Sequence, residues 1–203
     1  MSEHGEPIPI SYFQIPIFQP RSQPETTMTN DLRYPIGRFS RPSDVTDAAR
    51  QQYIDEIAAT PAHLRAAVDR LSDDQLDTPY RPEGWTVRQV VHHVPDSHLN
   101  AYVRFKWALT EDTPPIKTYD EKAWAELVEA RTAPIDLSLA LLDALHERWV
   151  LFLRALPAAD FARAVQHPEW GRVNLDMFLA LYAWHGRHHV AHITSLRERM
   201  GWG

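Results

Sequence analysis

Apolar residues recur at alternating spacings of three and four along much of the chain, which is the pattern of helices with one buried face. We expect four such helices, over residues 45–71, 86–110, 137–156 and 174–200. The segments between them are expected to be loops: 72–84, 111–134 (with a short acidic amphipathic piece near 123–130) and 157–173. No strand of useful length shows period-two alternation. The pattern predicts an all-α fold, a four-helix bundle, whose two long connections leave the order of the helices open.

Local signals predict where these helices begin and bend. Thr86 and Gln89 have the T-x-x-Q spacing of a capping box, in which each side chain bonds the backbone N–H of the other residue. We therefore expect a helix to start after Thr86. Pro61 and Pro95 fall inside predicted helices, where a proline removes one backbone hydrogen bond and bends the helix.

The first part of the chain differs from the rest. Residues 1–33 carry closely spaced prolines and no apolar periodicity, so we expect a disordered, proline-rich tail there and one folded domain over 34–203. Acidic residues near the N-terminus, where a secretory signal would be positive, argue against a signal peptide. Met28 is an alternative start of the protein.

The composition narrows the class of protein. The chain has 203 residues, 44% of them hydrophobic and 24% charged, which suits one soluble globular domain. A net charge of −6 without a basic patch argues against a nucleic-acid partner, and no apolar run is long enough for a membrane span. The chain has no cysteine, which fits a cytoplasmic protein and leaves histidines and carboxylates to hold any metal.

Histidines occupy the apolar stripe of the last predicted helix. His185, His189 and His192 continue, at helical spacing, the stripe that begins with leucine and phenylalanine. His185 and His189 are one turn apart, so both rings can bind one object, and we expect a divalent metal. A second cluster, His92 and His93, lies on the 86–110 helix, where the stripe favours His93 only weakly.

Other interpretations of these histidines stay open at this point. Hydrogen bonds to neighbours also explain a histidine in a core, without any metal. The H-x-x-x-H pair lacks the glutamate of H-E-x-x-H zincins, which argues against a metalloprotease of that class. Three histidines leave a coordination position open, as in catalytic zinc sites, and nickel, cobalt or iron would accept the same ligands.

Residues around the expected metal are assigned supporting positions. We expect His192 and Tyr182, each one turn from a candidate ligand, to lie beside the site. We expect His188 to face the surface. Three further histidines receive no role: His98, His146 and His167.

Five motifs are specific as a combination: Tyr34–Gly37, Gly84–His93, Asp96–Asn100, Tyr119–Trp124 and Trp184–Ile193. Together they resemble the YfiT-like branch of the DinB superfamily. Members of that branch carry the name metal-dependent hydrolase, and the branch includes bacillithiol S-transferases. The resemblance covers nearly everything from Tyr34 to Trp202, and it implies a homodimer of four-helix bundles with one zinc-type metal per subunit. In that family the first histidine ligand comes eight residues after the tryptophan that starts the helix. The resemblance therefore implies His93, His185 and His189 as ligands, with Pro95 as a departure from the small residue expected there.

Three functions follow from this pattern. The first, which we favour, is metal-dependent hydrolysis of a small molecule by activated water. The second is transfer of a low-molecular-weight thiol, such as bacillithiol, to an electrophile, and the lack of an obvious general base near the metal slightly favours it. The third is a metal-binding bundle without turnover. No motif names the substrate.

Overall fold

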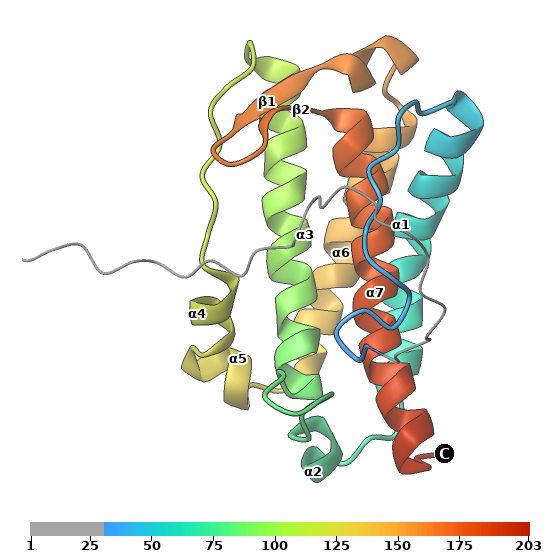
Figure 1. The fold of residues 1–203 in the computed structure, drawn as a ribbon, viewed down its shortest axis with the longest axis vertical. Helices are drawn as coiled ribbons and strands as arrows, with labels where there is room; N and C mark the ends of the chain where they lie inside the picture. Colours follow the sequence, from blue (N-terminus) through green and yellow to red (C-terminus); the bar gives the residue numbers. More distant parts are fainter. Residues whose placement is uncertain (1–30) are drawn as a thin grey trace, which may run out of the picture.

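Four helices of 20 or more residues dominate the structure, a computed structural model that describes residues 31–203 (Figure 1). They are α1 (Asp47–Val68), α3 (Val87–Thr110), α6 (Ile135–Arg154) and α7 (Leu175–Met200). The predicted four-helix bundle is confirmed, and each predicted helix end lies within three residues of the observed one.

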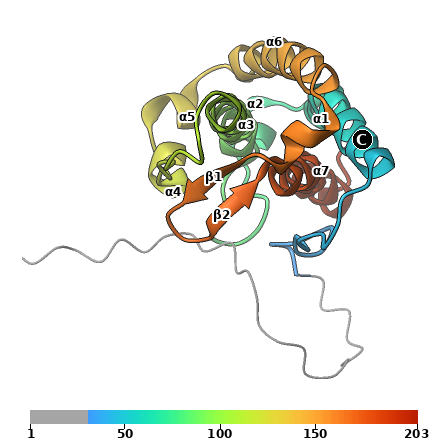
Figure 2. The ribbon, with the colours of Figure 1, turned by 90° about the horizontal axis from the view of Figure 1, so that it is seen from above.

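The helices do not follow an up-down-up-down order. Seen from above, α1 and α3 stand diagonally across the bundle, and each packs against both α6 and α7 (Figure 2). In Figure 1, α1 and α7 run downward while α3 and α6 run upward. The connection from α3 to α6 therefore returns along the whole bundle, and it carries two short helices, α4 (Glu121–Ala125) and α5 (Val128–Thr132). The short helix α2 (Asp73–Leu76) joins α1 to α3.

The segment 157–173, which we expected to be a loop, contains regular structure. A 3-10 turn, Ala158–Ala162, leads into an antiparallel hairpin of β1 (Ala164–His167) and β2 (Gly171–Asn174). The expectation that the whole segment is a loop is wrong, because strands of four residues are too short for alternation to be visible in the sequence. Gly171 adopts a φ of 69°, which suits the tight turn between the strands.

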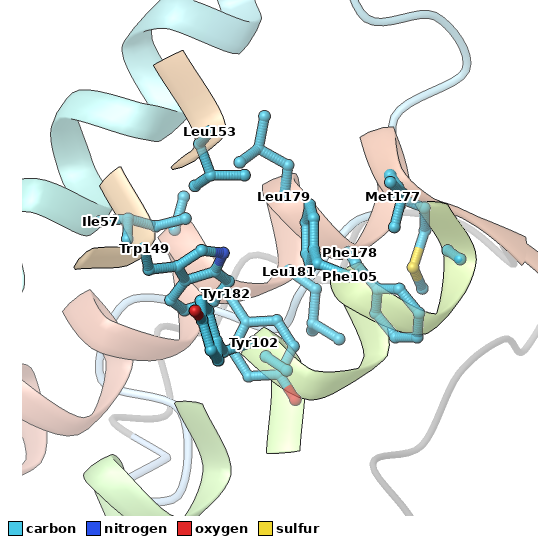
Figure 3. Close-up of a cluster of buried hydrophobic side chains, with 14 of the residues drawn as sticks. Ile57, Tyr102, Phe105, Trp149, Leu153, Met177, Phe178, Leu179, Leu181 and Tyr182 are labelled. Carbon is cyan, nitrogen blue, oxygen red and sulfur yellow. The ribbon is translucent and has the colours of Figure 1, made fainter. Parts of the chain in front are cut away.

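Two apolar clusters fill the core at different heights of the bundle. The cluster on the side of the β1–β2 hairpin includes Phe105, Trp149 and Phe178 (Figure 3). The cluster on the side of α2 includes Leu64 and Ile193. Between these heights the helices contribute buried polar side chains: Thr60, His93, Ser97, His98, His146, His185, His188, His189 and His192. A layer rich in histidine therefore separates the two halves of the core.

The predicted tail lies mostly outside the described residues, so its disorder stays a prediction. Its last residues, 31–33, are described, and the backbone carbonyl of Arg33 accepts a hydrogen bond from His192 Nε2 (3.1 Å). Within residues 31–203, no helix is long and apolar enough to cross a membrane.

Candidate metal centre

The beginning of α3 determines where His93 lies. Thr86 Oγ1 accepts a hydrogen bond from the backbone N–H of Gln89 (3.2 Å), and Gln89 Oε1 accepts one from the backbone N–H of Thr86 (2.9 Å). The predicted capping box is therefore confirmed. Gln89 Nε2 also donates to the carbonyl of Ala125 (2.7 Å), which ties this helix start to α4. His93 lies about one turn after Gln89, so the cap sets the height of its ring in the bundle.

Three buried imidazoles meet between α3 and α7, those of His93, His185 and His189. Each offers one ring nitrogen, and these nitrogens all lie within 4.8 Å of one another. His93 Nε2 is 3.4 Å from His185 Nε2. None of the three side chains is more than 7% exposed. The structure thus brings together the three residues that the sequence singled out as ligands.

Burial keeps these imidazoles neutral. It lowers the pKa of His93 to about 3 and holds the pKa values of His185 and His189 well below their usual range, with further lowering from the neighbouring imidazoles. A neutral imidazole carries one N–H and one lone pair, and the lone pair binds metal. Three such nitrogens converging in a buried site fit the donor set of a zinc-type cation.

The three imidazoles line a pocket of about 400 Å³, which suits a small molecule. Aromatic side chains form part of its wall: Tyr34, Tyr80, Trp85 and Trp184. Basic side chains also line it: Arg33, Arg38, Arg81 and Lys122. Three acidic side chains, Glu83, Glu121 and Glu126, complete the lining, so the pocket offers apolar surfaces and charges of both signs close to the histidines.

A smaller cavity of about 90 Å³ is lined by Arg104 and Tyr182, and His185 and Glu121 line both it and the larger pocket. Burial raises the pKa of Glu121 to about 7, although the nearby Arg104 cation acts in the opposite direction. We did not single out Glu121 from the sequence. Its position within the Tyr119–Trp124 motif was the available signal.

Both residues expected to support the ligands lie beside them. Tyr182 is buried, its ring centroid is 5.6 Å from that of His185, and burial raises the pKa of its hydroxyl. His192 Nδ1 lies 3.4 Å from His189 Nδ1. His192 thus contacts a candidate ligand through its ring nitrogen, whereas Tyr182 packs against the ring of another.

His188 does not face the surface, so that prediction is wrong. It is 7% exposed and stacks on Trp184, with ring centroids 4.2 Å apart. Tyr34 lies near it, at 5.9 Å between centroids. Figure 1 shows the segment before α1, in blue, running along α7. Helical periodicity alone could not reveal that this segment covers the face of α7 that carries His188.

The neighbouring His92 points away from the three imidazoles. Its Nδ1 lies 2.7 Å from Ser138 Oγ, and its Nε2 lies 3.1 Å from the carbonyl oxygen of Ala133. These contacts direct its ring toward the start of α6. Of the two neighbours between which periodicity could not choose, the structure therefore places His93, and not His92, beside His185 and His189.

Two histidines to which we gave no role are part of the same layer. His98 and His146 are 0% and 1% exposed, and a hydrogen bond of 2.8 Å joins them. His98 Nε2 also lies 3.1 Å from His185 Nδ1. No sequence signal indicated that they would connect to a candidate ligand.

Comparisons with known proteins agree with this geometry. The family model of the DinB superfamily matches residues 56–193, which include all three clustered histidines. A Bacillus mycoides (strain KBAB4) protein named "Putative metal-dependent hydrolase" is 54% identical over 172 residues, covering 85% of this chain and 99% of its own. A Bacillus cereus (strain B4264) protein of the same description is 54% identical over 173 residues, with the same coverage.

A solved structure extends the likeness to the fold. It is that of YfiT from Bacillus subtilis, described as "a probable metal-dependent hydrolase with an unusual four-helix bundle topology". YfiT is 50% identical, and the two structures superpose with a TM-score of 0.83 over 85% of this chain and 99% of YfiT. The chain belongs to the DinB superfamily, and its resemblance to the YfiT-like branch is confirmed.

Proposed function

We propose that the protein is a metal-dependent hydrolase of a small molecule, with one divalent cation per chain held by His93, His185 and His189. The observation that carries this proposal is the convergence of three buried, neutral imidazole nitrogens within 4.8 Å beside a substrate-sized pocket. The names of the B. mycoides and B. subtilis relatives support the same activity. Zinc is the expected cation, and nickel or another divalent ion would accept the same ligands.

The chain's own residues account for binding and proton transfer. When bound, the cation would supply Lewis acidity, which polarises a substrate carbonyl and makes water reactive at neutral pH. The aromatic wall of the pocket packs against the substrate, and its basic side chains orient negatively charged groups. A carboxylate oxygen of Glu121 accepts or returns a proton, because a pKa of about 7 lets this group exchange protons at neutral pH.

A second function would use the same site, the transfer of a low-molecular-weight thiol such as bacillithiol to an electrophile. The pocket is lined by four basic side chains and three acidic ones, Glu83, Glu121 and Glu126, and this small excess of basic groups favours it, because an ionised thiol is negatively charged. The two reactions differ in whether turnover needs a thiol.

Metal content tests the site. The purified protein should contain one equivalent of divalent metal per chain by elemental analysis, and Ala variants at His93, His185 and His189 should each lose it. His188→Ala is the matched control, since this histidine is equally buried beside the site but lies outside the three. Equal metal content in the control and the three variants would refute the assignment.

Turnover tests the reaction. The metal-loaded protein should hydrolyse one or more members of a panel of esters and amides without added thiol, and Glu121→Gln should lower the rate while leaving the metal bound. Turnover only with bacillithiol and an alkylating electrophile would assign the thiol transfer instead. A full metal site with neither activity would indicate a metal-binding bundle without catalysis.

We also propose that the protein is a cytoplasmic homodimer. The absence of cysteine supports a reducing compartment. Exposed leucines on α6, Leu137, Leu141 and Leu151, support an apolar surface for self-association. Sedimentation at micromolar concentration should give twice the chain mass of 23.4 kDa, and a clean monomer would refute the dimer.

A further inference from the structure

A chain of hydrogen bonds leads away from His185 into the core. His185 Nδ1 lies 3.1 Å from His98 Nε2, and His98 Nδ1 lies 2.8 Å from His146 Nε2. His146 Nδ1 lies 2.7 Å from the backbone carbonyl oxygen of Ile57. Each ring nitrogen along this path meets one partner, so the three imidazoles join the candidate metal site on α7 to the backbone of α1 through α3 and α6.

The contact at the Ile57 end of this series determines which nitrogen donates in each hydrogen bond. A carbonyl oxygen can only accept, so His146 Nδ1 must carry the proton and donate it to Ile57. This carbonyl is available because its usual helical donor would be the N–H of residue 61, four positions later, and Pro61 has none. The proline inside α1 thus leaves a free backbone acceptor for His146.

The direction then passes from ring to ring. His98 and His146 are 0% and 1% exposed, and a charged imidazole is costly to bury, so both rings are neutral with one proton each. With its proton on Nδ1, His146 accepts at Nε2, and His98 must donate from Nδ1. His98 then accepts at Nε2, and His185 must donate from Nδ1. The lone pair of His185 is therefore on Nε2, the atom that lies 3.4 Å from His93 Nε2 and 3.4 Å from Ser97 Oγ, whose hydroxyl can donate to it.

The second histidine of the H-x-x-x-H pair has an equivalent arrangement. His192 Nε2 donates to the carbonyl of Arg33 (3.1 Å), so its Nδ1 is an acceptor. His189 Nδ1 lies 3.4 Å from that acceptor and must carry the proton. Its lone pair is then also on Nε2. Each candidate ligand on α7 thus contacts a neutral imidazole that leads to a backbone carbonyl, directly from His192 to Arg33, and from His98 through His146 to Ile57.

We propose that His98 and His146 are positioning residues that fix His185 in the tautomer with its proton on Nδ1 and its bare Nε2 directed at the metal site, a role that rests on the proposed metal function. The reason for such an arrangement is physical. A lone imidazole distributes its proton between two nitrogens, whereas a metal needs the lone pair on one particular nitrogen before it binds. The hydrogen-bonded series His185–His98–His146–Ile57, which we call the relay, selects that nitrogen before the metal binds.

The tautomer can be measured in the metal-free protein. Long-range ¹H–¹⁵N correlation spectra distinguish a protonated Nδ1 from a protonated Nε2, and the His185 resonance is assigned by its loss in His185→Ala. Wild-type His185 should carry its proton on Nδ1. In His98→Phe the acceptor is gone, and the proton should move wholly or partly to Nε2. A wild-type His185 protonated on Nε2 would overturn the proposal without any further variant.

Zinc affinity provides the second readout. His98→Phe should weaken zinc binding by about 10–100-fold, the usual effect of removing an outer partner of a metal ligand. His98→Gln should restore most of the affinity, because an amide can both accept from His185 and donate to His146. His92→Phe is the matched control: it removes another buried, hydrogen-bonded histidine of α3 whose bonds do not lead to His185. The zinc affinity of this variant should stay within about twofold of wild type.

The outcomes distinguish the role of His98 and His146 from the existence of the metal site. A His98→Phe protein that keeps the wild-type zinc affinity, or keeps the His185 proton on Nδ1, overturns the role of the relay. If His98→Phe does not fold, His146→Leu, which removes the anchor of the relay rather than the contact to His185, is subject to the same two criteria. A wild-type protein that binds no zinc would refute the metal site itself, while the tautomer spectrum of that protein would still decide the direction of the hydrogen bonds.

Discussion

Gly186 directly follows His185, where α7 packs against α1. A Cβ at this position would lie 2.5 Å from Thr60 Oγ1 and 2.8 Å from Thr60 Cγ2, which is closer than van der Waals contact allows. The two helices therefore touch through a hydrogen atom at a point between two candidate ligands. The positions of His185 and His189 relative to α1 thus depend on the absence of a side chain at Gly186.

We predict that Gly186→Ala destabilises the fold. Overpacking costs about 1–3 kcal/mol, and the gain of up to about 1 kcal/mol from replacing glycine within a helix offsets only part of it. Chemical denaturation measures the difference. Thr60→Ala removes the two shortest contacts, so the double variant should recover much of the loss. Equal stability of Gly186→Ala and wild type would mean that α1 and α7 separate at no cost.

His146 should make the protein sensitive to acid. Burial lowers its pKa to about 4 in the folded state, although the carbonyl of Ile57 and the nearby Asp143 act in the opposite direction. In the unfolded chain its pKa is about 6.5. As pH falls below 6.5 the unfolded state takes up the proton first, so stability present at neutral pH is lost toward pH 4. The loss from this one group between pH 7 and pH 5 should be about 2 kcal/mol.

Denaturation of chelator-treated protein at both pH values measures this loss without a contribution from metal. His146→Gln keeps a donor for Ile57 and an acceptor for His98 but cannot be protonated, so its stability should change less across the same range. An unchanged pH dependence in His146→Gln would contradict the assignment of the effect to this histidine.

At the scale of elements, the features that could be predicted from the sequence are those that depend on residues close together in the chain. The long helices and the Thr86–Gln89 cap follow from spacing and side-chain chemistry, and the structure confirms both. The hairpin at 164–174 was missed because its strands are held by pairing with each other and not by an extended pattern. The buried position of His188 was missed because a distant segment covers it. Contacts between segments far apart in the chain have no signature in helical periodicity.

We predict that Thr86→Ala costs about 1 kcal/mol of folding free energy, the usual loss of an N-cap. The box holds the first turn of α3 and, through Gln89, contacts α4. Urea denaturation measures the change, and Thr86→Ser, which keeps the hydroxyl, should remain near wild type. A loss near zero in the Ala variant would show that the turn is held by its packing alone.

At the scale of the whole molecule, the N-terminal segment reaches the site through the backbone carbonyl of Arg33. We predict that removing residues 1–27 leaves the melting temperature and zinc affinity unchanged. Removing residues 1–33 deletes the carbonyl of Arg33 that anchors His192, so zinc should bind about tenfold more weakly. Calorimetric titration with zinc compares the two truncations. A large loss in the shorter deletion would show that residues 1–27 pack on the bundle.

The candidate site itself was only partly predictable from the chain. His185 and His189 are neighbours on one helix, so their spacing was sufficient. His93 needed the family resemblance, because Pro95 obscures the phase of α3 beyond it. Glu121, His98 and His146 reach the site from other elements, and only the folded arrangement of α4, α3 and α6 brings them there.

The last prediction concerns the coupling of metal to folding. The three imidazoles lie between the two apolar clusters and join α3 to α7, so a cation bound there cross-links the bundle in its folded state only. Zinc at about 100 times its dissociation constant should add about 2.7 kcal/mol of stability. For a chain of this size that corresponds to a rise of about 5–10 °C in melting temperature. Calorimetry of zinc-loaded and chelator-stripped protein at pH 7.5 measures the rise, and His185→Ala, which lacks a ligand, should show none. Identical melting of the two wild-type preparations would mean that the buried histidines are held by their hydrogen bonds alone.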